Sequence, residues 1–205
     1  PAVLCALLAG WTGSAWIDRL YLAAKSKDIL SFPDAVASRS RFRKPLLALL
    51  LLLSFVRLWS IIGNPFSLLY YTIAVAFLSF ATATDLEQYV IFDAMLLPFA
   101  LAGLCYTLHM QLPVENHIAA ALGGGLLFFL LAVVTRGAVG GGDIKLVAAM
   151  GLWFGCRSLL QIIVYGLLAG GAAALIMLLA KQKNRHSYFA YGPYFALSAI
   201  YFLLN

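Results

Sequence analysis

The sequence has few charged residues and few cysteines. Only 11% of its 205 residues are charged, and cysteine occurs three times, at Cys5, Cys105 and Cys156. A soluble domain carries about 25% charged residues, so this composition excludes an ordinary soluble globular domain. The cysteines lie within or beside apolar runs, and no Cys/His spacing is typical of a metal site. We therefore expect them to be small buried hydrophobic residues.

The abundant residues are apolar, at 63% of the chain, with a mean hydropathy of +0.94. This composition predicts an all-α, polytopic membrane protein that forms one domain over residues 1–205. About eight spans are expected, the first of them retained rather than cleaved as a signal peptide, at about 2–22, 45–62, 66–84, 93–111, 117–135, 144–156, 158–180 and 188–204. The sixth is short, so six or seven crossings remain as alternatives.

The basic residues are unevenly distributed between the apolar runs. Most lie in a basic loop at 23–44, in the segment 181–187, or beside the glycines at 140–142. With eight spans and the N-terminus outside, all of these fall on the cytoplasmic side, and only Arg57 and Arg157 lie toward the other side. The net charge of +6 therefore indicates orientation in a lipid bilayer, and we expect no nucleic-acid partner.

Two acidic residues border apolar runs. Asp85 follows the run at 66–84, and Asp143 precedes the run at 144–156 behind Gly140–Gly142. Carboxylates between membrane segments are expensive and usually functional. Two crossings separate these aspartates, so both are predicted at the cytoplasmic boundary, where they could meet. The alternative is that the glycines form only a flexible turn and that Asp143 is a helix N-cap.

A pair of carboxylates can hydrolyse a peptide bond without a metal or a nucleophilic side chain. Close together, they cannot both ionise easily, so one acts as a base toward water while the other donates a proton. The sequence has no HExxH helix and no GxSxG elbow that would indicate other hydrolytic chemistry. A glycine loop can also approach an extended peptide closely.

Three motifs carry a family resemblance. The run GGGDIKLVAAMG at 140–151 closely resembles the second catalytic motif of the type IV prepilin peptidases, aspartic proteases of the bacterial inner membrane. Asp85, in TDLEQYVIFD at 84–93, falls where that family has its first catalytic aspartate, although Phe92 replaces the usual proline. The sequence YGPYFAL at 191–197 resembles a Phe-Gly-Pro-type motif of the family.

The resemblance implies an activity and a place for it. Members cleave the short basic leader from prepilins and pseudopilins at the cytoplasmic face of the inner membrane. Asp85 and Asp143 would then be the catalytic pair, and the preflagellin peptidases share the same motif. No particular oligomeric state is predicted.

Five other residues become candidates for the site through the same resemblance. Gly140 and Gly142 would shape the site. Lys145 would tune an aspartate or contact the substrate, unless it is a lysine that snorkels at the membrane interface. Glu87 and Asp93 would attract the basic leader, unless they are solvated loop acids.

One departure from the family concerns cofactors. Many members carry two CxxC pairs in the first cytoplasmic loop, often with zinc, and methylate the new N-terminus with S-adenosylmethionine. The segment 23–44 contains no cysteine, so we expect no zinc. The same absence argues against N-methylation, and S-adenosylmethionine would be a cofactor only if that activity is present. Proteolysis itself would need no cofactor.

Two other functional classes stay open on the residues. A transporter or channel could use the acids as a proton relay, but such sites usually lie at the membrane midplane rather than at one face. An assembly or scaffold protein that has lost its activity would not need both aspartates.

Overall fold

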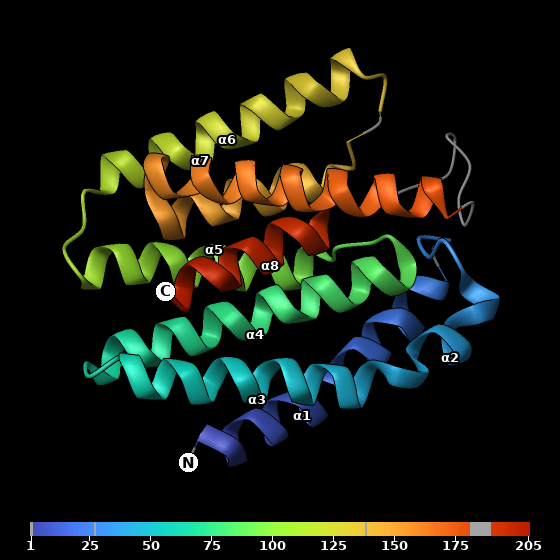
Figure 1. Cartoon of the computed structure of the whole chain (residues 1–205), viewed down its shortest axis with the longest axis horizontal. Coiled ribbons are helices and arrows are strands. Elements are labelled where there is room, and N and C mark those ends of the chain that lie inside the picture. Colours follow the sequence, from blue (N-terminus) through green and yellow to red (C-terminus); the bar gives the residue numbers. More distant parts are fainter. Residues whose placement is uncertain (1, 27, 138, 181–189) are drawn as a thin grey trace.

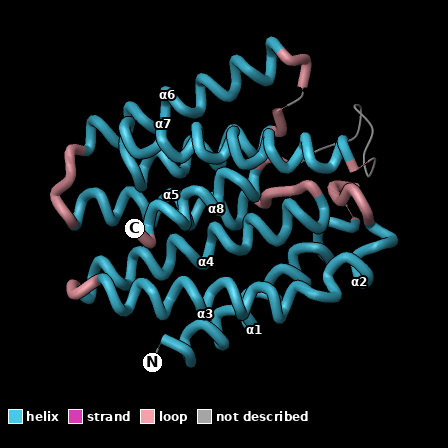
Figure 2. Tube along the Cα trace, in the orientation of Figure 1, coloured by secondary structure: helices cyan, strands magenta, loops and turns pink. Residues whose placement is uncertain are grey.

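The part of the chain that the structure describes consists of helices joined by short turns and connections. The computed structural model describes residues 2–26, 28–137, 139–180 and 190–205, and no strand occurs in these ranges (Figure 2). The long helices are α1 (Ala2–Lys25), α3 (Arg43–Ile61), α4 (Pro65–Gln88), α5 (Asp93–His109), α6 (Val114–Val134), α7 (Gly141–Leu179) and α8 (Gly192–Leu203). The all-α prediction is confirmed.

The basic segment 23–44 is not an open loop in its described residues. It contains the end of α1, the short turns η1 (Pro33–Ala35), α2 (Val36–Arg39) and η2 (Ser40–Phe42), and the start of α3. The second basic segment, 181–187, and the beginning of the last predicted span lie outside the described residues.

Helix α7 is broken at Gly155, close to the predicted boundary between 144–156 and 158–180. Gly155 has φ 68° and ψ 177°, a conformation that glycine adopts readily. A Cβ on Gly124 of α6 would lie 3.1 Å from Val147 and 2.8 Å from Leu159. A straight helix would separate those two residues by about 18 Å. The chain therefore reverses at Gly155, and both legs of α7 pack on α6.

The helices run back and forth between two ends of the bundle (Figure 1). One end carries both chain termini and the turns at 62–64 and 110–113. The other end carries the described residues of the α1–α3 connection and the segments 89–92, 135–137 and 139–140. The C-terminal end of α4 and the N-terminal end of α7 thus lie at the same end of the molecule.

Four helical runs of the described chain are long and apolar enough to cross a membrane: 33–61, 65–88, 114–134 and 141–179. Helices α5 and α8 are apolar but shorter. The coarser prediction, an all-helical protein with membrane-spanning helices, agrees with the structure. The count of about eight crossings is not confirmed. The prediction that the three cysteines are buried is wrong, because Cys5, Cys105 and Cys156 are all exposed.

The position of α8 is determined by its close packing against two glycines in the second leg of α7. A Cβ on Gly166 would lie 2.4 Å from the ring of Phe195, and one on Gly170 would lie 2.9 Å from the ring of Tyr191. Small residues let helices approach in this way. The second leg of α7 therefore seats the start of α8, which brings Gly192 to the end of the bundle where α4 ends and α7 begins.

Candidate active site

The side chains of Asp85 and Asp143 meet at Gly192. A Cβ on Gly192 would lie 2.6 Å from Oδ2 of Asp85 and 3.0 Å from Oδ1 of Asp143. The backbone N–H of Gly192 also donates toward both carboxylates. Three helices, α4, α7 and α8, therefore each contribute one residue to this point. Any larger residue at position 192 would occupy the space where the two carboxylates face each other.

Asp85 is buried, with 6% of its surface exposed. Its Oδ2 is a buried oxygen for which the described part of the chain provides no hydrogen-bond partner. Leaving a buried polar atom unpaired costs free energy, so such atoms in folded proteins call for an explanation, and catalysis is one. The location of this atom beside a second carboxylate marks the pair as the candidate site.

Asp85 is followed by a sharp end to its helix. Tyr89 adopts a left-handed conformation, with φ 54° and ψ 36°, and its backbone N–H bonds to the carbonyl oxygen of Asp85 at 2.9 Å. This left-handed ending is a common helix C-cap. The chain consequently leaves α4 one turn after Asp85 and runs along the site through Val90 and Ile91.

Asp143 lies in the first turn of α7. Gly140 is the N-cap, and its carbonyl oxygen accepts from the backbone N–H of Asp143 at 3.1 Å. The backbone N–H of Gly140 in turn donates toward the Asp143 carboxylate, as in a capping box. Asp143 is therefore not itself the N-cap, and the alternative assignment of that role is wrong. The positive end of the helix dipole favours a carboxylate here.

A cleft of about 720 Å³ contains both aspartates. This volume is typical of a ligand-binding cavity. Its lining comes from the α1–α3 connection, the end of α4 and the segment after it, the start of α7 with the residues before it, and the segment before α8. The residues are Ser31, Phe32, Asp85, Tyr89, Val90, Ile91, Gly137, Gly140, Gly141, Gly142, Asp143 and Ala190.

The glycines before Asp143 differ in how closely they are approached. A Cβ on Gly142 would lie 3.2 Å from Cβ of Ile91, and one on Gly140 would lie 3.4 Å from Oδ2 of Asp143. A Cβ on Gly141 would meet nothing within 4 Å. Gly142 therefore allows α7 to begin directly against the segment that leaves α4, while Gly141 faces open space.

Asp93 and Lys145 bind each other and do not line this cleft. Nζ of Lys145 donates to both carboxylate oxygens of Asp93, at 2.7 and 2.8 Å. The two side chains are 71% and 58% exposed, respectively. An exposed pair of this kind adds less than about 1 kcal/mol to stability. Lys145 is two residues from Asp143 in sequence, but its ammonium group is directed to another helix.

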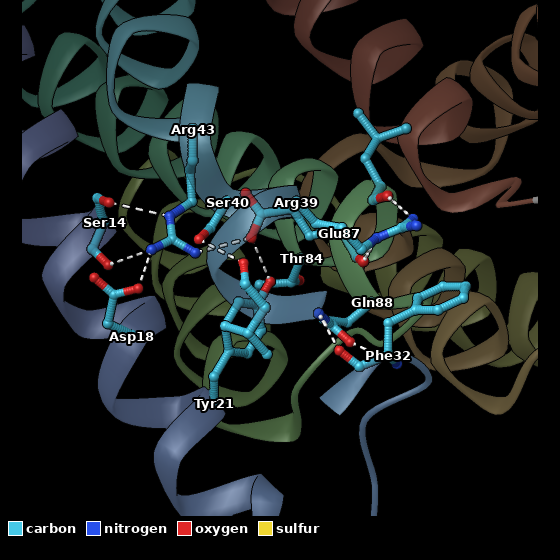
Figure 3. Close-up of polar contacts among 12 residues, drawn as sticks. Ser14, Asp18, Tyr21, Phe32, Arg39, Ser40, Arg43, Thr84, Glu87 and Gln88 are labelled. Carbon is cyan, nitrogen blue, oxygen red and sulfur yellow. Dashed lines mark hydrogen bonds and ion pairs between the residues drawn. The ribbon is translucent and has the colours of Figure 1, made fainter. Parts of the chain in front are cut away.

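Glu87 is buried in a polar network outside the cleft (Figure 3). Its carboxylate accepts from Tyr21 Oη and from the Arg43 guanidinium, both at 2.8 Å. Arg43 also donates to Ser14 Oγ at 3.0 Å and to Asp18. The network joins α1, α3 and α4 directly beside the turn that carries Asp85.

Sequence reasoning missed two features of the site. Gly192 was noted only as part of the YGPYFAL motif, although its Gly-Pro pair was the available signal. The partners of Glu87 lie 44 and 66 residues away in the chain, and no local pattern indicates such contacts.

Comparison with known families supports the motif assignment. The model of the type IV leader peptidase family matches residues 72–175, about half of the chain, and this range contains both aspartates. Curated relatives carry the name "Prepilin leader peptidase/N-methyltransferase". A relative from Neisseria gonorrhoeae is 34% identical over 132 residues, which cover 62% of this chain and 45% of the relative. A relative from Dickeya chrysanthemi is 31% identical over 170 residues, or 77% of this chain and 58% of the relative.

The chain spans about half the length of these curated relatives. No solved structure matches it significantly.

Proposed function

Because the chain belongs to the type IV leader peptidase family, we propose that it is an aspartic endopeptidase that removes the basic leader from type IV prepilins or pseudopilins. The family and the four apolar helices indicate a bacterial membrane protein. The observation that carries the proposal is the convergence of Asp85 and Asp143 on Gly192, inside one cleft.

The surroundings of the two carboxylates suggest different roles in hydrolysis. Both carboxylates receive the backbone N–H of Gly192, but Asp143 also receives that of Gly140 and lies at the positive end of a helix. These donors stabilise a carboxylate, so we assign Asp143 as the base that takes a proton from water. Asp85 is buried near the C-terminal end of α4 with Oδ2 unpaired by the described residues, which suits the protonated partner.

In the reaction, the water oxygen attacks the scissile carbonyl carbon while Asp143 accepts a water proton. Asp85 donates its proton to the carbonyl oxygen, and a tetrahedral intermediate forms. As the C–N bond breaks, the proton held by Asp143 passes to the leaving nitrogen. The second hydroxyl proton of the intermediate returns to Asp85, which restores both carboxyl groups.

The substrate has to be extended where it is cut, because a helical peptide hides its carbonyl groups in hydrogen bonds. The glycines at 140–142, which are the N-cap and the first residues of α7, leave room for such a strand beside Asp143. The cleft opens at the end of the bundle where the basic α1–α3 connection lies. By the positive-inside rule, we place this end at the cytoplasmic face of the inner membrane.

Neither zinc nor another cofactor is part of the proposed proteolysis, since two carboxyl groups and a water molecule complete the reaction. The relatives' printed name includes an N-methyltransferase activity. We do not extend that activity, or S-adenosylmethionine, to this chain, because the segment 23–44 lacks cysteine.

The test uses the purified full chain in proteoliposomes with a candidate prepilin. Mass spectrometry of the product reads the cleavage site and any added methyl group. Asp85→Asn and Asp143→Asn should each abolish cleavage while the protein still inserts. Glu115→Gln changes an exposed acid in the first turn of α6, next to the turn at 110–113, and should leave cleavage unchanged. Full cleavage by either aspartate variant would reject the pair. Ion-coupled flux without proteolysis would favour a transporter.

A further inference from the structure

The last turn of α4 holds the connection between α1 and α3. Gln88 is fully buried, and its side-chain amide makes two hydrogen bonds with the backbone of Phe32 (Figure 3). The Phe32 N–H donates to Oε1 at 2.9 Å, and Nε2 donates to the Phe32 carbonyl oxygen at 3.3 Å. The amide thus binds both polar groups of one residue, as a neighbouring β-strand would.

Arg39, which itself belongs to the connection, binds the same turn of α4. Its guanidinium donates to the carbonyl oxygens of Glu87 and Leu86, the latter at 3.1 Å. It also lies 3.9 Å from the centroid of the Phe32 ring, a distance typical of a cation–π contact. The Phe32 ring meets that of Tyr89 edge-on at 5.5 Å. Both the backbone and the ring of Phe32 are therefore held against the end of α4.

The held residue lies in the cleft. Ser31 and Phe32 line it together with Asp85, Tyr89 and the glycine loop. Gln88 follows Asp85 by three residues on the same helix, a spacing that puts the two side chains on one face. One turn of α4 thus carries both the Asp85 carboxyl group and the Gln88 side chain that holds Phe32.

We propose that the Ser31–Phe32 segment is a peptide-binding wall of the cleft and that Gln88 is the positioning residue that holds it beside Asp85. A strand that reaches the two aspartates from this side has to pass along that wall. The inference rests on the proposed function, since it assigns the substrate to an extended segment of the cleaved peptide.

Kinetics separate positioning from a general structural role. Gln88→Ala removes both hydrogen bonds to Phe32, so the KM for a prepilin should rise on the order of tenfold while kcat changes less. Gln88→Glu keeps the acceptor for the Phe32 N–H but loses the donor, and should be intermediate. The control is Gln161→Ala, an exposed glutamine on the second leg of α7, which should behave as the wild type.

A crosslinking measurement reports contact without turnover. In the Asp143→Asn background, a photoreactive phenylalanine analogue at position 32 should crosslink to prepilin residues beside the cleavage site. The same analogue at Phe42, which is 62% exposed and does not line the cleft, should not. Adding Gln88→Ala should lower the yield at position 32.

The outcomes distinguish this inference from the function on which it rests. If the wild type does not cleave prepilins, the proposed function fails and the wall assignment fails with it. If the wild type cleaves, but Gln88→Ala leaves KM unchanged and position 32 gives no crosslink, only the wall assignment is overturned. A loss of kcat and thermal stability at unchanged KM would also overturn it, since that pattern indicates a general structural role.

Discussion

Alanine at position 192 should separate the two aspartates without unfolding the protein. Gly192 does not have a left-handed φ, so the backbone itself accepts alanine. The new methyl group would lie 2.6 Å from Oδ2 of Asp85 and 3.0 Å from Oδ1 of Asp143. In proteins, a Cβ atom essentially never lies closer than 3.0 Å to a heavy atom to which it is not bonded. The carboxyl groups therefore have to move.

The size of that movement sets the expected loss of activity. Ordinary van der Waals contact begins at 3.4 Å, so Oδ2 of Asp85 has to retreat by just under 1 Å. Misplacing a catalytic group by about 1 Å costs on the order of 10²-fold in rate. That factor corresponds to about 2.7 kcal/mol of transition-state free energy. We expect kcat/KM for prepilin cleavage by Gly192→Ala to fall by this amount.

The assay follows leader removal in proteoliposomes, with the thermal midpoint of the protein measured in detergent. Gly123→Ala is the control, because a Cβ there meets nothing within 4 Å. In Gly142→Ala, the methyl group would meet Ile91 at 3.2 Å, so its kcat/KM should lie between those of Gly192→Ala and Gly123→Ala. Wild-type cleavage by Gly192→Ala would show that Gly192 does not set the distance between the carboxyl groups.

Three further predictions concern stability and cofactors. Gly151→Ala would put a methyl group 2.3 Å from the backbone nitrogen of Ala121, so α6 and α7 should separate and the thermal midpoint should fall; an unchanged midpoint would contradict the close packing. Arg43→Ala should lower stability by about 3–5 kcal/mol, because it leaves the buried Glu87 carboxylate without its cation, whereas Lys145→Ala should change it by less than about 1 kcal/mol. Equal effects in denaturation would refute this contrast. A metal chelator should not change the cleavage rate, and a loss of activity restored by zinc would contradict the two-carboxylate mechanism.

The sequence was sufficient for the helical class and for much of the helix order. Apolar runs and turn residues act locally, so the break in α7 could be placed near Gly155 from sequence alone. The number of membrane crossings was harder to predict from the sequence, because α5, α8 and the first leg of α7 are shorter than a typical span. Counting passes of the chain was still enough to put Asp85 and Asp143 at the same end.

The neighbours of each candidate residue depended on the tertiary structure. Glu87 and Asp93 are both acids near Asp85 in sequence, and the same leader-binding role was suggested for them. In the fold, Glu87 is buried against Arg43, whereas Asp93 pairs with Lys145 at the surface. Helical direction separates them, because Glu87 belongs to the last turn of α4 and Asp93 begins α5.

The sequence by itself determined that two costly carboxylates border apolar helices at one end of a membrane protein. Only the tertiary structure decided that they meet at Gly192 and that Phe32 shares their cleft. The physical reason is the distance along the chain between the residues that determine each property. Partition into a membrane depends on the residues along one segment, while a site depends on how distant segments pack together, such as those of Phe32 and Gln88 or of Asp143 and Gly192.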